Sequence, residues 1–166
     1  VRAMLRAEAD VIMLGGSSAS LSVSSPDIFR KYELPFVQQA AELCRDAGIV
    51  SHLHVCGRSW ELLQMVAEES DLASMEPIEE PPSGNINLKE AKKRYGHRMC
   101  LKGNINTTNF MLFATPEQIE EKCKQLIDDA GEDGGFILST GDQCGRDTPD
   151  ANLFKMVEVA ETYGKY

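Results

Sequence analysis

Short apolar segments alternate with helix-like segments along the chain, and this alternation constrains the fold more than any other feature. Five units of this kind in series predict a parallel sheet whose strands are joined by helical crossovers. The helix starts carry capping residues, with Pro at the first helical position of three of them. We expect strands at residues 10–14, 49–55, 72–75, 99–102 and 135–139, and helices at 25–46, 59–69, 87–95, 115–130 and 148–163.

Two arrangements fit this α/β pattern: an open doubly wound sheet, or part of a (β/α)8 barrel. A whole barrel takes about 250 residues, whereas this chain has 166. As a barrel, the chain would therefore be the C-terminal five βα units. No low-complexity linker interrupts the pattern, so we expect a single domain over residues 1–166. The first residue is Val1 and not Met, which suggests a piece of a longer polypeptide.

Charge and cysteine usage exclude several classes of protein. The net charge is −9, and a nucleic-acid surface needs clustered Lys and Arg instead. No apolar run approaches the roughly 20 residues of a membrane span, and no signal peptide opens the chain. The five cysteines are an odd number and do not resemble a secreted disulfide framework. These features predict a cytoplasmic protein that binds neither nucleic acid nor a membrane.

Metal-ligating side chains follow two of the predicted strands. In parallel α/β folds the functional site lies at the carboxyl ends of the strands. His54 and Cys56 are two residues apart at such an end, so their side chains point the same way. Cys144 follows the fifth strand. One imidazole and two thiolates suit Zn²⁺, and three protein ligands leave the open position that is typical of a catalytic zinc site.

Four further residues near these strand ends are candidates for the site. Glu76 is a candidate catalytic residue and fourth, displaceable zinc ligand, or else a surface carboxylate of an acidic loop. Asp142 is a candidate acceptor for His54 that would orient the imidazole. Asn104 and Ser17 would donate hydrogen bonds to the substrate, although the Ser-rich loop is equally consistent with ordinary loop chemistry.

Three segments resemble the C-terminal part of the uroporphyrinogen decarboxylase superfamily: "HLHVCG", "LKGNINTTNFMLFATPEQIEEK" and "GGFILSTGDQCGRDTPDANLFKMVEVAETYG". Within it, they are most similar to the corrinoid-dependent methyltransferases, such as the methylcobalamin:coenzyme M methyltransferases of methanogenesis. The resemblance implies a TIM barrel without its first strands, with His54, Cys56 and Cys144 as zinc ligands. The chain departs from the family where Asp142 and Gln143 precede Cys144.

The resemblance implies methyl transfer from a corrinoid protein carrying methylcobalamin to a small thiol. A free thiol is mostly protonated at neutral pH, and binding to zinc would remove its proton. The unpaired edges of five parallel strands also predict a homo-oligomer. Two alternatives remain open: a metal-free uroporphyrinogen decarboxylase, and a non-catalytic role as a structural zinc site or an inactive fragment.

Overall fold

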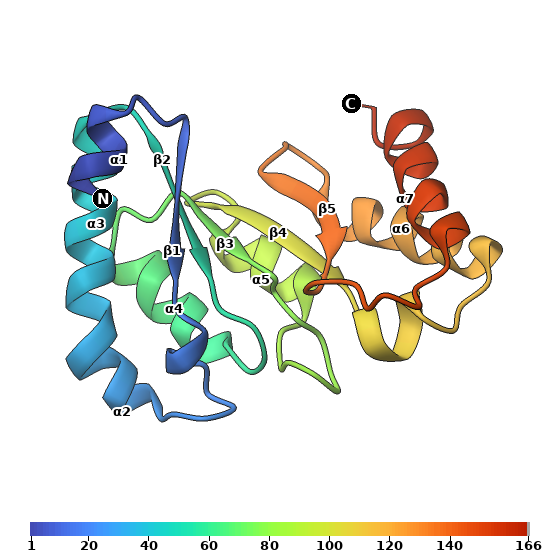
Figure 1. Ribbon diagram of the computed structural model, residues 1–166, viewed down its shortest axis with the longest axis horizontal. Helices are drawn as coiled ribbons and strands as arrows, with labels where there is room; N and C mark the ends of the chain where they lie inside the picture. Colours follow the sequence, from blue (N-terminus) through green and yellow to red (C-terminus); the bar gives the residue numbers. More distant parts are fainter. Residues whose placement is uncertain (166) are drawn as a thin grey trace.

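A computed structural model describes residues 1–165 and contains a five-stranded parallel sheet in the order β1-β2-β3-β4-β5 (Figure 1). Strands adjacent in sequence are therefore adjacent in space, as in a (β/α)8 barrel, whereas a doubly wound sheet reverses its order. The predicted parallel α/β architecture is confirmed. The strands are β1 (Val11–Gly15), β2 (Val50–His54), β3 (Ser74–Glu76), β4 (Cys100–Ile105) and β5 (Phe136–Thr140).

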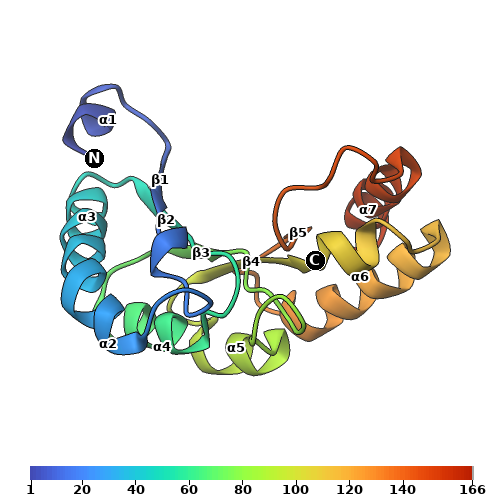
Figure 2. The ribbon, with the colours of Figure 1, turned by 60° about the horizontal axis from the view of Figure 1, so that its bottom comes forward.

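Helices connect the strands and lie along the outer side of the curved sheet (Figure 2). Among residues 1–165, none of them is long and apolar enough to span a membrane. The α-helices are α1 (Arg2–Arg6), α2 (Pro26–Ile28), α3 (Leu34–Asp46), α4 (Trp60–Glu69), α5 (Leu88–Tyr95), α6 (Pro116–Ala130) and α7 (Asp150–Thr162). Three short helical segments accompany them: η1 (Ser17–Ala19), η2 (Phe29–Glu33) and η3 (Thr107–Met111).

Side-chain caps start α2, α5 and α6 where the sequence predicts them, whereas α7 begins only at Asp150, with Pro149 as its N-cap residue and no side-chain cap bond. Thr115 accepts a hydrogen bond from the Gln118 N–H, and the Gln118 side chain accepts one from the Thr115 N–H. This reciprocal pair is a capping box, and it satisfies two N–H groups that would otherwise lack partners. Ser25 and Asn87 cap α2 and α5 in the same way through single side-chain bonds.

The continuous helix predicted for residues 25–46 is wrong, because the segment is divided into α2, the π-helical turn η2 and α3. Pro35 lies at the start of α3 and carries no N–H, so it cannot bond the carbonyl four residues earlier. The wider turn of a π-helix accommodates this missing backbone hydrogen bond. The turn η3 was not predicted at all.

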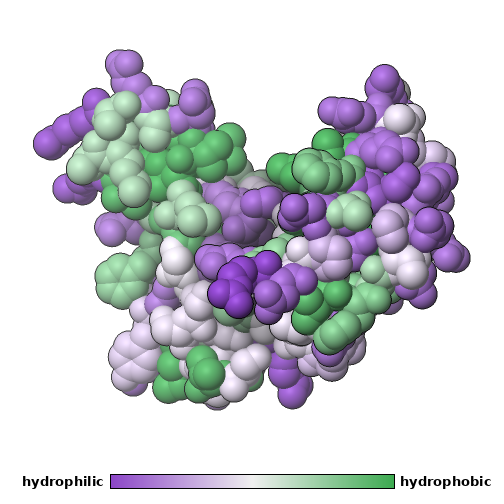
Figure 3. Space-filling model, turned by 45° about the vertical axis from the view of Figure 1, so that its right-hand side comes forward, coloured by the Kyte–Doolittle hydropathy of each residue, from purple (hydrophilic) through white to green (hydrophobic). Residues whose placement is uncertain are grey.

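The two faces of the sheet differ sharply in polarity. Leu53, Met75 and Leu101 point toward the helices and are completely buried in the apolar core. The alternate positions point to the inner face, where His54 on β2 lies in register with Glu76 on β3. Figure 3 shows this side as a hollow with hydrophilic side chains in its middle. The register thus brings polar groups from several strands to one place.

Candidate metal centre

Three side chains, one from the end of a strand and two from loops, converge at the carboxyl end of the sheet. One donor atom each from His54, Cys56 and Asp142 lies within 4.8 Å of the others, and all three residues are partly buried. His54 ends β2 and Cys56 follows it, whereas Asp142 comes from the loop after β5. An imidazole, a thiol and a carboxylate so close together form a donor set that fits a zinc ion.

The backbone after β2 explains why His54 and Cys56 share a direction. Val55 between them is completely buried and points into the core, so its two neighbours point away from it. Gly57 then has a φ of +79°, a conformation that favours glycine. The chain therefore turns away immediately after Cys56 and leaves the thiol accessible from the inner face.

Glu76 contacts two histidine rings and a lysine ammonium group. Its carboxylate lies 3.0 Å from Nδ1 of His54 and 3.2 Å from Nε2 of His52, and it forms an ion pair with Lys102. Burial raises the pKa of the Glu76 carboxyl, but its polar contacts with Lys102, His54 and His52 outweigh burial and lower the pKa to about 2. Glu76 is thus an ionised acceptor for the His54 ring, which leaves the other ring nitrogen free to bind a metal.

The sequence suggested Glu76 as a fourth zinc ligand and Asp142 as the acceptor for His54, whereas the surroundings of the two residues suit the exchanged roles. Glu76 is the residue that contacts His54, and Asp142 lies among the donor atoms. The Asp142 loop is held by local bonds, since Thr140 Oγ1 donates to the Asp142 carbonyl at 2.8 Å. Cys144 does not join this group of donors. It is partly buried and packs against the apolar core.

The two candidate substrate-binding residues have partners within the protein. The Cys56 thiol donates to Ser17 Oγ at 3.5 Å. Asn104 is 1% exposed, and its Nδ2 donates to the carbonyl of Ile78 at 2.9 Å. Ser17 therefore lies beside a metal-binding candidate, whereas Asn104 fixes the loop that follows β3.

Sequence reasoning missed Glu79 as part of the site. Its carboxylate is buried and accepts a hydrogen bond from the Gly57 N–H. Burial raises the pKa of Glu79, the Gly57 N–H lowers it, and the charge of Asp142 raises it. In the sequence Glu79 stands beside Glu80 in an acidic loop, and only its position just after β3 indicates a place near the site.

A cavity of about 380 Å³ opens next to the donor group. Glu76 and Lys102 form one part of its wall, and Ser139, Thr140 and Gln143 form another. Its volume suits a small substrate, because ligand pockets span roughly 300–1,000 Å³. The cavity gives a small molecule direct access to His54 and Asp142, which also line it.

Comparison with known proteins shows that the chain is similar to two kinds of enzyme. The family model for uroporphyrinogen decarboxylase matches residues 1–163. The methylcobamide:CoM methyltransferase MtbA of Methanosarcina mazei is 26% identical over 162 residues, which are 98% of this chain and 44% of that protein. A uroporphyrinogen decarboxylase of Chlorobaculum parvum is 28% identical over 166 residues, covering 98% of this chain and 45% of the relative.

The fold also matches a solved structure. A methyltransferase from Methanosarcina mazei superposes with a TM-score of 0.79 at 25% identity, over 98% of this chain and 45% of that one. The chain thus spans less than half the length of each of these relatives. The predicted barrel-type architecture and its partial extent are confirmed by this match.

Proposed function

Because the chain belongs to the uroporphyrinogen decarboxylase family, we propose that it acts in zinc-dependent methyl transfer from a methylated corrinoid protein to a small thiol. The observation that carries this proposal is the convergence of His54, Cys56 and Asp142 beside a cavity. The similarity to a methylcobamide:CoM methyltransferase over 98% of the chain supports it. A metal-free decarboxylase does not need a thiol and an imidazole at the carboxyl end of the sheet.

In the proposed site, His54, Cys56 and Asp142 hold the ion. Glu76 accepts a hydrogen bond from the Nδ1–H of His54, which leaves Nε2 as the nitrogen that binds the metal. Lys102 balances the charge of Glu76 and keeps this carboxylate fixed. Cys144, two residues beyond Asp142, remains the alternative third ligand that the family resemblance implies.

Bound zinc would supply a Lewis-acidic centre at which a substrate thiol is deprotonated near neutral pH. The thiol would release its proton to solvent, and its sulfur would attack the methyl group of the corrinoid. The carbon–cobalt bond breaks with its electron pair on cobalt, so the products are a methyl thioether and a Co(I) corrinoid. The cavity beside His54 and Asp142 accommodates the small thiol, and the corrinoid protein approaches from the open inner face.

The first experiment measures proton release and methyl transfer by the zinc-loaded chain. Adding a small thiol should release about one proton per site, because a thiol enters and a thiolate is bound. Supplying methylcobalamin should then give Co(I), seen by its visible absorption, and chelation of zinc should abolish the reaction. No proton release and no Co(I), together with release of carbon dioxide from uroporphyrinogen, would favour the decarboxylase instead.

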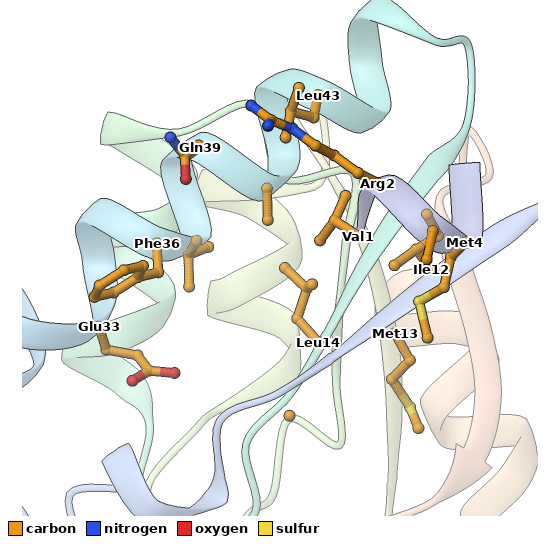
Figure 4. A pocket seen from close by; sticks show the side chains of 14 residues that line it. Val1, Arg2, Met4, Ile12, Met13, Leu14, Glu33, Phe36, Gln39 and Leu43 are labelled. Atoms are coloured by element: carbon orange, nitrogen blue, oxygen red, sulfur yellow. The ribbon is translucent and has the colours of Figure 1, made fainter. Parts of the chain in front are cut away.

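We also propose that the chain forms homo-oligomers. Strands β1 and β5 are each paired on one side only within residues 1–165, and free strand edges promote association. Beside β1, a groove of about 820 Å³ is bordered by side chains of α1, β1 and α3 (Figure 4). Met13 and Phe36 on its border are 60% and 69% exposed. A second copy of the chain would cover this apolar surface.

Sedimentation over a range of concentrations tests this association. Replacing Phe36 with Glu should weaken self-association at least about tenfold, which corresponds to about 1.4 kcal/mol. Val23 is 75% exposed and lies outside the groove, so Val23→Glu is the matched control. A wild-type chain that stays monomeric at high concentration would contradict the proposal.

A further inference from the structure

The four backbone N–H groups that follow Cys56 are all bound by side chains from neighbouring loops. The N–H of residue 57 donates to Glu79, and that of residue 58 donates to Ser22 at 3.1 Å. Those of residues 59 and 60 donate to Asn85 Oδ1 at 2.8 and 3.0 Å. Segment 57–60 is therefore clamped between the loop after β1 and the loop after β3.

Glu79 is the unusual member of this clamp, because its carboxylate is buried. The residue is 7% exposed, and among residues 1–165 no cationic side chain forms a salt bridge with it. The neighbouring Glu80 instead pairs with Lys122 at 2.9 Å. A buried carboxylate is costly unless hydrogen bonds stabilise it. The hydrogen bond that Glu79 accepts comes from the Gly57 N–H, immediately after Cys56.

The turn at Gly57 has little free space around it. A Cβ atom at this position would lie 2.5 Å from Ser22 Oγ and 2.9 Å from Ser20 Oγ, so the loop after β1 packs tightly against the backbone. Glu79 is itself anchored, since its carbonyl accepts the Ile86 N–H at 3.0 Å. The turn thus packs tightly against the loop after β1, and its N–H donates to a residue whose backbone is itself hydrogen-bonded.

We propose that Glu79 is a positioning residue of the metal centre, which fixes the Gly57 amide and thereby the direction of the Cys56 thiolate. This inference rests on the proposed function, because it assumes that Cys56 binds the metal. Residues that orient metal ligands through hydrogen bonds typically contribute 10–100-fold to metal affinity. Glu79 would act through the backbone and not through the ligand's own side chain.

Two substitutions separate the hydrogen bond from the charge. Glu79→Gln keeps an acceptor oxygen for Gly57 and removes the negative charge, whereas Glu79→Ala removes both. We expect Glu79→Ala to weaken zinc binding about 10–100-fold and Glu79→Gln to stay close to wild type. Glu80→Ala, in the same loop, is the control and should leave zinc affinity unchanged.

Zinc affinity is measured by competition with a chelator, and hydrogen exchange of the Gly57 amide gives a second readout in the metal-free chain. This amide should exchange faster in Glu79→Ala than in Glu79→Gln, with circular dichroism confirming that both are folded. Equal losses of zinc affinity in the two variants would indicate a charge effect and overturn the positioning role. Unchanged Gly57 exchange in Glu79→Ala would also overturn it.

The outcome also distinguishes this inference from the function on which it rests. If the wild-type chain binds no zinc, the proposed metal centre fails and the inference fails with it. If the wild-type chain binds zinc and Glu79→Ala binds it equally well, the inference alone fails.

Discussion

Replacing Cys56 with Ser should lower zinc affinity by at least about 100-fold and abolish thiol-dependent proton release. The substitution keeps the size of the side chain but exchanges a thiolate for a neutral hydroxyl, which is a poor zinc ligand. Loss of a direct ligand should exceed the 10–100-fold cost of losing an orienting residue. The metal content of the purified chain and competition with a chelator measure the effect.

Cys100→Ser provides the matched control, because Cys100 is a partly buried free cysteine that lies outside the donor group. It should retain wild-type zinc affinity. Full zinc occupancy in Cys56→Ser would contradict the metal centre as proposed. Circular dichroism must show that both variants fold.

The same assay identifies the third ligand. Asp142 is the donor that the structure brings to His54 and Cys56, whereas Cys144 is the donor that the family resemblance implies. Asp142→Asn should therefore weaken zinc binding strongly, and Cys144→Ser should weaken it less. The reverse order would mean that the loop after β5 rearranges when zinc binds.

The strands and the meeting of His54 with Cys56 were predictable because both depend on local rules. Alternation of side chains along a strand fixes the direction of residues two apart, and a parallel sheet brings the carboxyl ends of its strands together. The apolar runs that form β1 to β5 therefore specified both the fold class and the end of the sheet at which the site lies.

The detailed roles of the carboxylates were not predictable in the same way. Glu76 and Glu79 are three residues apart, yet one contacts His54 and the other contacts the Gly57 backbone. Strand register places Glu76 beside His54, whereas the partner of Glu79 depends on the path of the loop after β3. Asp142 likewise depends on the loop after β5. Tertiary contacts set these paths, and no residue pattern within the loops encodes them.

One such contact leads to the second large expected effect: Gly103→Ala should destabilise the chain by about 4 kcal/mol, or prevent folding. Gly103 on β4 has a φ of +151°, where residues with a side chain are strained. A Cβ atom there would also collide with the carbonyl oxygen of Pro77. That carbonyl is backbone and cannot move aside cheaply, since the adjacent Ile78 carbonyl accepts a hydrogen bond from Asn104.

Gly15→Ala is the matched control, because Gly15 also lies in a strand and no atom beyond its chain neighbours lies within 4 Å of a Cβ atom built there. Its unfolding free energy in denaturant should stay within about 0.5 kcal/mol of wild type. A loss below about 1 kcal/mol in Gly103→Ala would show that the loop after β3 yields easily. Because Glu79 lies two residues after Pro77 on this loop, such yielding would also contradict the fixed geometry on which the role of Glu79 depends.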